Sequence, residues 1–284
     1  MRRSRLTVLV AAPVLALGVV AGCGSDGGGS SSGTSASSGS SSSASPSSSA
    51  SSSSASSSSR GALSTGDFGT RVYDALKKAG TARFAVTVAF GAQRSTGEGE
   101  VDLSTSPPAS RVTQEAAGSG RTEAILVGGK FYLKSPQLGS KYLEIDPTDK
   151  TGPGALLGSM GATADPGRVL KAMDAAAKVT AVGTEEVGGV STTHYRVVVP
   201  RDALVKALGT DPRVANVLPP EVAYDMWVDD QDLVRKQSGV VTVASNKVTT
   251  TTTFTDFGKP VTIKAPPASQ TTTRVPGAPT TTGS

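Results

Sequence analysis

Strand-like segments that follow one another through short turns are the feature that most limits the fold of this chain. In the clearest of them, large apolar side chains alternate with smaller ones, which is the two-residue period of a strand with one covered face. The large set is Phe84, Val86, Val88 and Phe90, and the small set is Ala85, Thr87 and Ala89. Further segments of this kind lie at about 94–104, 110–117, 121–127, 130–134, 142–146, 179–187, 190–199, 221–229, 233–244 and 246–256. Gly128-Gly129 and Gly188-Gly189 are typical of tight hairpins, so the pattern predicts an antiparallel meander rather than βαβ units.

Three segments have a helical pattern instead. The first carries Phe68, Val72, Leu76 and Ala79 on one face, and Asp67 is a candidate N-cap. The second follows Asp165-Pro166 and has an apolar stripe at Val169, Leu170, Met173, Ala176 and Ala177. The third begins at Pro200 and carries Leu204, Val205 and Leu208. A few helices and many strands predict an α+β fold in which the helices cover one face of the sheet.

The N-terminus has the composition of a secretory signal. Three arginines precede an apolar run from Leu6 to about Val20, which ends in Ala21-Gly22-Cys23. Small residues directly before the chain's single cysteine resemble the bacterial lipobox, which implies cleavage between Gly22 and Cys23 and acylation of Cys23. An exported protein has little reason to keep one unpaired cysteine. We therefore expect a lipid anchor that holds the protein to the outer face of the cytoplasmic membrane.

Composition divides the rest of the chain. We expect a signal peptide at 1–22, the lipidated cysteine with a disordered Ser/Gly-rich tether at 23–62, a folded domain at 63–265 and a loose Thr/Pro-rich tail at 266–284. The tether is a passive linker or an O-glycosylated stalk. Loss of residues 1–22 removes Arg2, Arg3 and Arg5 and leaves 25 basic against 23 acidic side chains, a net charge of +2. Nucleic-acid binding is therefore not expected.

Residues that could carry catalysis are scarce, and we expect no enzyme, cofactor or metal. His194 is the single histidine and lies in a strand pattern, so His/Cys metal sites and Cys–His pairs lack partners. The carboxylates Asp225, Asp229, Asp230 and Asp232 suit a solvated turn better than a calcium loop. Trp227 is expected in the core or at an interface rather than against lipid. The run of threonines from 249 to 253 favours a strand and gives no binding signal.

Several segments resemble the actinobacterial LppX/LprG-like lipoproteins (LppX_LprAFG), whose domain is a LolA-like half-barrel. The resemblance lies in 127–133, 194–199, 226–229 and 254–263, together with the lipobox and the order of elements. It implies a curved antiparallel sheet whose concave face is covered by a few helices around an apolar cavity that holds acylated lipids. These segments form turns and strands of a scaffold and carry no chemistry.

Two functions follow as hypotheses. In the first, the domain binds an acylated lipid or glycolipid in a cavity between the sheet and the helix after Pro166, and transport across the cell envelope is one role for such binding. Periodicity alone suggests the lining residues Phe84, Val86, Val88, Val169, Leu170 and Met173. In the alternative, the domain is solidly packed and acts as a structural or regulatory module on a protein partner, whose identity the sequence does not indicate.

Overall fold

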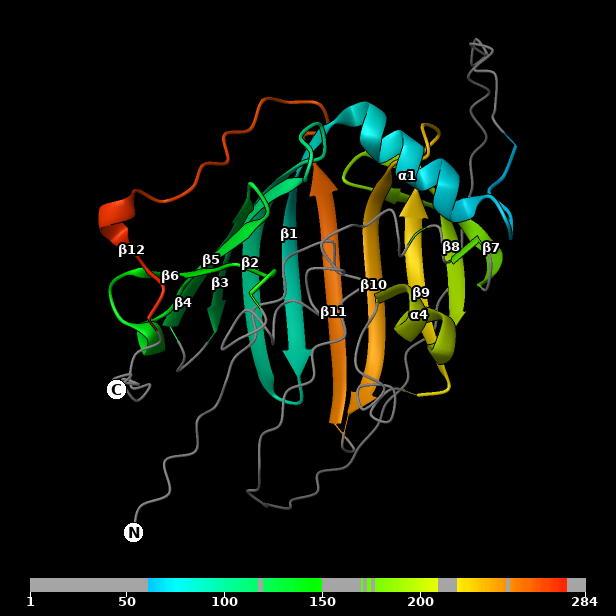
Figure 1. Cartoon of the computed structure of the whole chain (residues 1–284). Helices are drawn as coiled ribbons and strands as arrows, with labels where there is room; N and C mark the ends of the chain where they lie inside the picture. Colours follow the sequence, from blue (N-terminus) through cyan, green and yellow to red (C-terminus); the bar gives the residue numbers. More distant parts are fainter. Residues whose placement is uncertain are drawn as a thin grey trace, which may run out of the picture.

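The computed structural model describes residues 61–116, 120–149, 170, 173–174, 177–208, 219–243 and 246–274. The signal sequence, Cys23 and the Ser-rich tether lie outside these residues. In the described part of the chain, the strands form a twelve-stranded sheet in the order β12-β6-β5-β4-β3-β2-β1-β11-β10-β9-β8-β7 (Figure 1). Their bounds are β1 Thr81–Phe90, β2 Gln93–Asp102, β3 Ala109–Ala116, β4 Gly120–Val127, β5 Lys130–Lys134, β6 Tyr142–Ile145, β7 Lys178–Val187, β8 Val190–Pro200, β9 Glu221–Val228, β10 Val234–Val243, β11 Asn246–Thr255 and β12 Thr271–Thr272.

The sheet consists of two meanders that meet in its middle. The chain enters at β1 and runs outward through antiparallel neighbours to β6. It resumes at the opposite edge with β7 and returns through β8, β9 and β10 to β11, which pairs with β1. Apart from β12, every pairing is antiparallel. The predicted α+β class with an open antiparallel sheet is therefore confirmed, and most predicted strands match the observed ones within a few residues.

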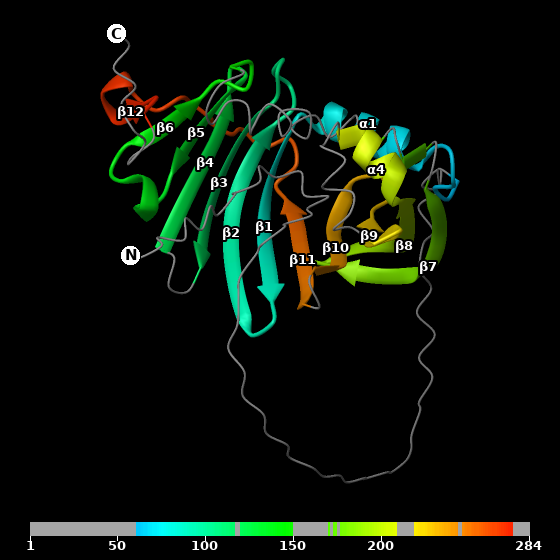
Figure 2. The ribbon, with the colours of Figure 1, turned by 60° about the horizontal axis from the view of Figure 1, so that its bottom comes forward.

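The two α-helices whose bounds the structure defines are α1 (Phe68–Ala79) and α4 (Arg201–Leu208). The β7–β11 part of the sheet curves around them (Figure 2). Phe68, Val72 and Leu76 are the buried apolar side chains of α1, and they join one cluster with Phe84, Val197 and Tyr224 of the sheet. We call the sheet face that carries these last three residues the inner face. It is apolar because alternate residues of the strands point toward the helices.

Paired glycines form the hairpins that the sequence predicts. Gly128 and Gly129 have φ values of 59° and 78°, and Gly188 and Gly189 have 59° and 80°. Backbone with positive φ at both central residues fits the twist of a two-residue hairpin, and glycine adopts it without steric cost. The strands β4–β5 and β7–β8 are consequently joined as predicted.

The segment after β11 crosses to the far edge of the sheet. Ile263 packs against Ile125, Tyr132 and Tyr142 on the outer face, and Thr271–Thr272 then pair in parallel with β6. The expectation of a loose tail from residue 266 is therefore wrong for 266–274. Threonine suits strands, and the backbone of β12 covers part of an otherwise unpaired edge.

Candidate functional site

The candidate site is the buried layer between the inner face and the elements that cover it. β1 contributes Phe84, Val86 and Val88, whose partners on β11 are Phe254, Thr252 and Thr250. Phe84 and Val86 are buried and Val88 is half-buried, whereas Ala85 is exposed. The predicted register of this strand is confirmed by this burial pattern.

Glycines on the neighbouring strand leave room for these side chains. A Cβ on Gly99 would overlap the ring of Phe84, and a Cβ on Gly97 would lie 3.1 Å from Cγ1 of Val86. Both glycines belong to β2 and pair with Phe84 and Val86. The large side chains of β1 can therefore lean over β2, because that strand presents no side chain at these positions.

Part of the predicted cavity lining does come together. Leu170 and Met173 are helical and buried, and they belong to the same apolar cluster as Phe84. Val88 packs against the edge of this cluster. Val169, Cys23 and Gly22 lie outside the described residues, so their predicted roles stay predictions.

The exposed fractions of Met173 and Leu170 indicate whether a cavity remains in the buried layer. Met173 keeps 1% of its surface exposed and Leu170 keeps 4%. A side chain that lines a water-sized cavity retains accessible surface inside it, so Met173 is contacted on nearly all sides. Val88 and Phe90, at the far end of β1, are half-buried and keep more surface open than Met173.

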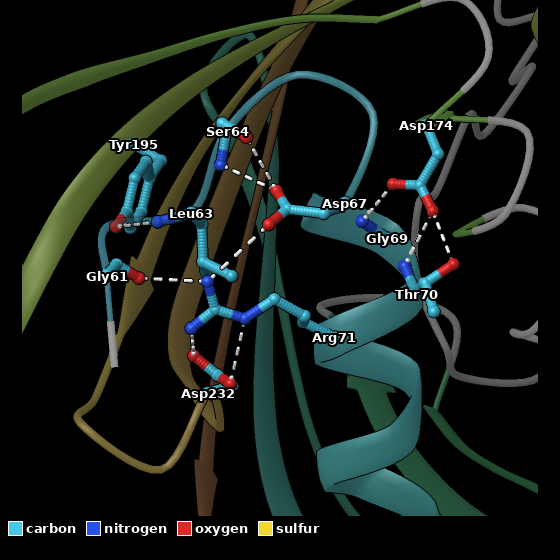
Figure 3. A network of polar contacts seen from close by, with 10 residues as sticks. All are labelled: Gly61, Leu63, Ser64, Asp67, Gly69, Thr70, Arg71, Asp174, Tyr195 and Asp232. Atoms are coloured by element: carbon cyan, nitrogen blue, oxygen red, sulfur yellow. Dashed lines mark hydrogen bonds and ion pairs between the residues drawn. The ribbon is translucent and has the colours of Figure 1, made fainter. Parts of the chain in front are cut away.

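The Asp174 carboxylate holds the helical segment that carries Leu170 and Met173, called here the covering segment, against α1 (Figure 3). The N–H groups of Gly69 and Thr70 donate to Asp174 at 2.5 and 2.8 Å, and the Thr70 hydroxyl donates to it at 2.6 Å. A Cβ on Gly69 would overlap the carbonyl oxygen of Leu170, so the two backbones lie in close contact. Asp174 therefore satisfies free N–H groups in the first turn of α1 and places a negative charge at its positive end.

Asp67 does not have the capping role that the sequence predicts. Its side chain makes no capping hydrogen bond to α1. Instead it accepts hydrogen bonds from the N–H and hydroxyl of Ser64 at 2.8 and 2.9 Å (Figure 3). Burial would raise the pKa of Asp67, but these hydrogen bonds and the nearby charge of Arg71 bring it below its ordinary value. The prediction failed because Asp174, 105 residues from Gly69 in sequence, occupies the helix end.

The turn between β9 and β10 is not the solvated loop that its acidic sequence indicates. Asp229 and Asp232 are 6% and 4% exposed. Asp229 accepts hydrogen bonds from the N–H groups of Gln231 and Leu233 at 2.9 Å each and pairs with Arg235 at 2.7 Å. Buried carboxylates need such partners to offset the loss of water, and the prediction of a solvated turn is wrong for these two residues.

The second buried aspartate of this turn connects it to the helix layer. Arg71 of α1 holds Asp232 through two contacts, at 2.8 and 3.2 Å (Figure 3). A pocket of about 610 Å³ lies beside this pair, lined by α1, the turn and Phe257-Gly258. Its wall includes the charged side chains Asp74, Lys78 and Asp230 as well as the ion pair, whereas the lining predicted for a lipid cavity is entirely apolar.

Two buried hydroxyl groups lie in this layer, and the sequence analysis predicted a role for neither. Tyr224 of β9 and Thr252 of β11 are 2% and 0% exposed, and among the described residues neither Tyr224 Oη nor Thr252 Oγ1 has a hydrogen-bond partner. Burial raises the pKa of the Tyr224 phenol. Strand alternation could have identified Thr250 and Thr252 as the inward members of the threonine run, because they face Val88 and Val86.

Trp227 and His194 lie on the outer face. Their rings are stacked with centroids 4.4 Å apart, and Lys236 Nζ lies 4.1 Å from the centroid of the indole. The indole N–H donates to Glu185 at 2.8 Å. Trp227 is buried, as expected, but it packs within a polar cluster opposite the core and not inside the core.

Among the described residues, no group of three or more His, Cys, Asp or Glu side chains could hold a metal ion. None of the helices in this part of the chain has the length and apolar character that a membrane span needs.

Comparisons with known proteins show similarity in structure only. No family model matches the chain, and neither does any curated protein. Among solved structures, the chain is similar to the Mycobacterium tuberculosis lipoprotein LppX, with 16% identity, a TM-score of 0.47 and coverage of 69% of this chain and 95% of that one. It is also similar to LprF from Mycobacterium bovis, with 16% identity, a TM-score of 0.43 and coverage of 72% and 98%.

A more distant similarity is to an outer membrane lipoprotein-sorting protein domain from Vibrio parahaemolyticus, with 9% identity, a TM-score of 0.28 and coverage of 67% and 89%. LppX and LprF bear the names of the lipoprotein family that the sequence resembles. At these identities and TM-scores the overlaps carry no function over to this chain.

Proposed function

We propose that the protein is an exported lipoprotein, anchored through Cys23, whose domain binds acyl chains of a lipid or glycolipid between the inner face and its cover. The observation that carries this proposal is the meeting of Phe84 from β1 with Leu170 and Met173 from the covering segment in one apolar cluster. Apolar layers enclosed by a curved sheet and helices are natural sites for hydrophobic ligands.

The way the cover is attached supports the same proposal. Asp174 bonds to the first turn of α1, whereas Leu170 and Met173 contribute apolar side chains to the layer. Apolar contacts are not directional. An acyl chain can therefore replace part of them without leaving a buried polar group unpaired.

The solidly packed alternative is favoured by one specific observation. Met173 is 1% exposed, which is what a filled core gives. In that case the domain would act through its surface on a protein partner, and no lipid would copurify with it.

A bulky substitution on the inner face distinguishes the two functions. Val88→Trp places an indole at the half-buried end of β1, and Ala85→Trp is the matched control on the exposed side of the same strand. If an acyl chain occupies the layer, Val88→Trp should reduce copurifying lipid with little loss of stability, whereas Ala85→Trp should reduce neither.

If the layer is filled by side chains, Val88→Trp should instead lower the free energy of unfolding by about 1–3 kcal/mol through overpacking. Absence of lipid from the wild type together with this destabilisation would contradict the lipid-binding proposal. Bound lipid and melting temperature are measured on the same preparations of the full chain.

A further inference from the structure

The inner face carries polar groups whose bonding capacity is unused within the described structure. Tyr224 Oη and Thr252 Oγ1 are buried and have no hydrogen-bond partner among the described residues. Leaving a hydroxyl buried and unpaired is destabilising, and such groups are few in native proteins. Neither atom has room for a water beside it in this structure, so a ligand atom reaches these hydroxyls only where an incoming acyl chain displaces part of the apolar packing.

Both hydroxyls belong to the same buried layer. Tyr224 on β9 pairs with Gly239 on β10, which pairs with Thr250 on β11. Thr252 lies two residues further along β11, and its β1 partner is Val86. Alternate residues of a strand share a face, so Tyr224 and Thr252 both point to the side where Phe84 and Val86 form the apolar layer.

Gly239 makes space for the tyrosine. A Cβ at this position would lie 3.1 and 3.2 Å from ring carbons Cδ1 and Cε1 of Tyr224, so one edge of the ring rests over the β10 backbone. The ring is thereby held in the layer. A tyrosine phenol carries its proton at neutral pH, so it can act as a hydrogen-bond donor.

We propose that Tyr224 and Thr252 donate hydrogen bonds to ester oxygens of an acylated ligand whose chains occupy the apolar layer. An ester carbonyl accepts hydrogen bonds and donates none, so it complements two hydroxyl donors. It also lies next to the hydrocarbon of each chain, as these hydroxyls lie next to Phe84 and Val86. The ligand class is thus ester-linked lipid, in preference to ether-linked lipid of the same length. This inference rests on the proposed lipid-binding function.

Matched lipid probes test the inference directly. The probes are a diacylglycerol and the dialkylglycerol of equal chain length, which lacks the ester carbonyls. Binding is measured on the full chain carrying Cys23→Ser, so that no attached acyl group competes for the layer. We expect the protein to bind the ester probe about 3- to 10-fold more tightly than the ether probe, the range of one ordinary hydrogen bond.

Variants that lack a single hydroxyl show which residue produces the preference for the ester probe. Tyr224→Phe and Thr252→Val should each reduce the ester preference without lowering the melting temperature of the lipid-free protein, because the lost group had no partner. Tyr195→Phe is the matched control. Its hydroxyl accepts the N–H of Leu63 at 3.0 Å, so its loss should lower the melting temperature and leave the ester preference unchanged.

Three other results overturn the inference. Equal binding of both probes rejects it while leaving the lipid-binding function intact. A lower melting temperature of lipid-free Tyr224→Phe, with an unchanged ester preference, shows that a buried water or the protein itself holds the hydroxyl. Failure of wild type to bind either probe rejects both the inference and the proposed function.

Discussion

Removal of the Asp174 carboxylate should destabilise the domain by releasing the start of α1. Asp174→Ala takes away the acceptor of two backbone N–H groups and of the Thr70 hydroxyl. Loss of a helix cap costs about 0.5–2 kcal/mol, and loss of a negative charge at a helix N-terminus costs about 0.3–1 kcal/mol. Since Asp174 is only partly buried, we expect a total of about 1–2 kcal/mol.

This loss can be read from thermal unfolding followed by circular dichroism. For a domain of this size, 1 kcal/mol shifts the melting temperature by about 2–4 °C, so the predicted decrease is about 2–8 °C. Asp174→Asn keeps an oxygen acceptor but loses the charge and should fall between wild type and Asp174→Ala. Asp67→Ala should cost less than Asp174→Ala, because the Asp67 carboxylate bonds to Ser64 and pairs with the Arg71 side chain but accepts no backbone N–H of the helix.

Amide hydrogen exchange provides the decisive readout. Exchange at Gly69 and Thr70 should accelerate in Asp174→Ala and remain at the wild-type rate in Asp67→Ala. The reasoning is refuted if Asp67→Ala exposes these two amides while Asp174→Ala leaves them protected.

Two further predictions concern the anchor and the β9–β10 turn. Cys23→Ser should abolish acylation and move the protein from the detergent phase to the aqueous phase in a partitioning assay, while the folded domain keeps its melting temperature; a wild-type protein found wholly in the aqueous phase would contradict the anchor. Asp229→Ala should lower the free energy of unfolding by about 3–5 kcal/mol in denaturant titration, because it leaves Arg235 without its partner. The exposed neighbour is the control: Asp230→Ala should change stability by no more than about 0.5 kcal/mol, and equal effects of the two would show that the turn is solvated.

Local patterns predicted much of the fold. The alternation in residues 84–90 identified the inner face of β1, and two glycine pairs identified hairpins, because strand period and turn chemistry depend on neighbouring residues. Pairing of β1 with β11 joins segments such as Phe84 and Phe254 that are far apart in sequence, and no local signal specifies it.

The missed features are also long-range or depend on burial. Asp174 reaches α1 from a segment whose own pattern shows only a helix, and β12 joins β6 across more than a hundred residues. The acidic sequence at 229–232 predicted a solvated turn because nothing local indicates that the fold brings Arg71 and Arg235 to these carboxylates. Leu170 and Met173 were predicted from periodicity to face the sheet, and they do join Phe84 in the core.

Native mass spectrometry of the wild-type full chain, purified from the envelope of its host, tests the central claim most directly. The account predicts a noncovalent adduct beyond the Cys23 acyl groups, which organic extraction identifies as an ester-linked lipid and which Val88→Trp reduces. A folded wild-type protein that carries no such adduct, and takes none up from added diacylglycerol, would contradict the account.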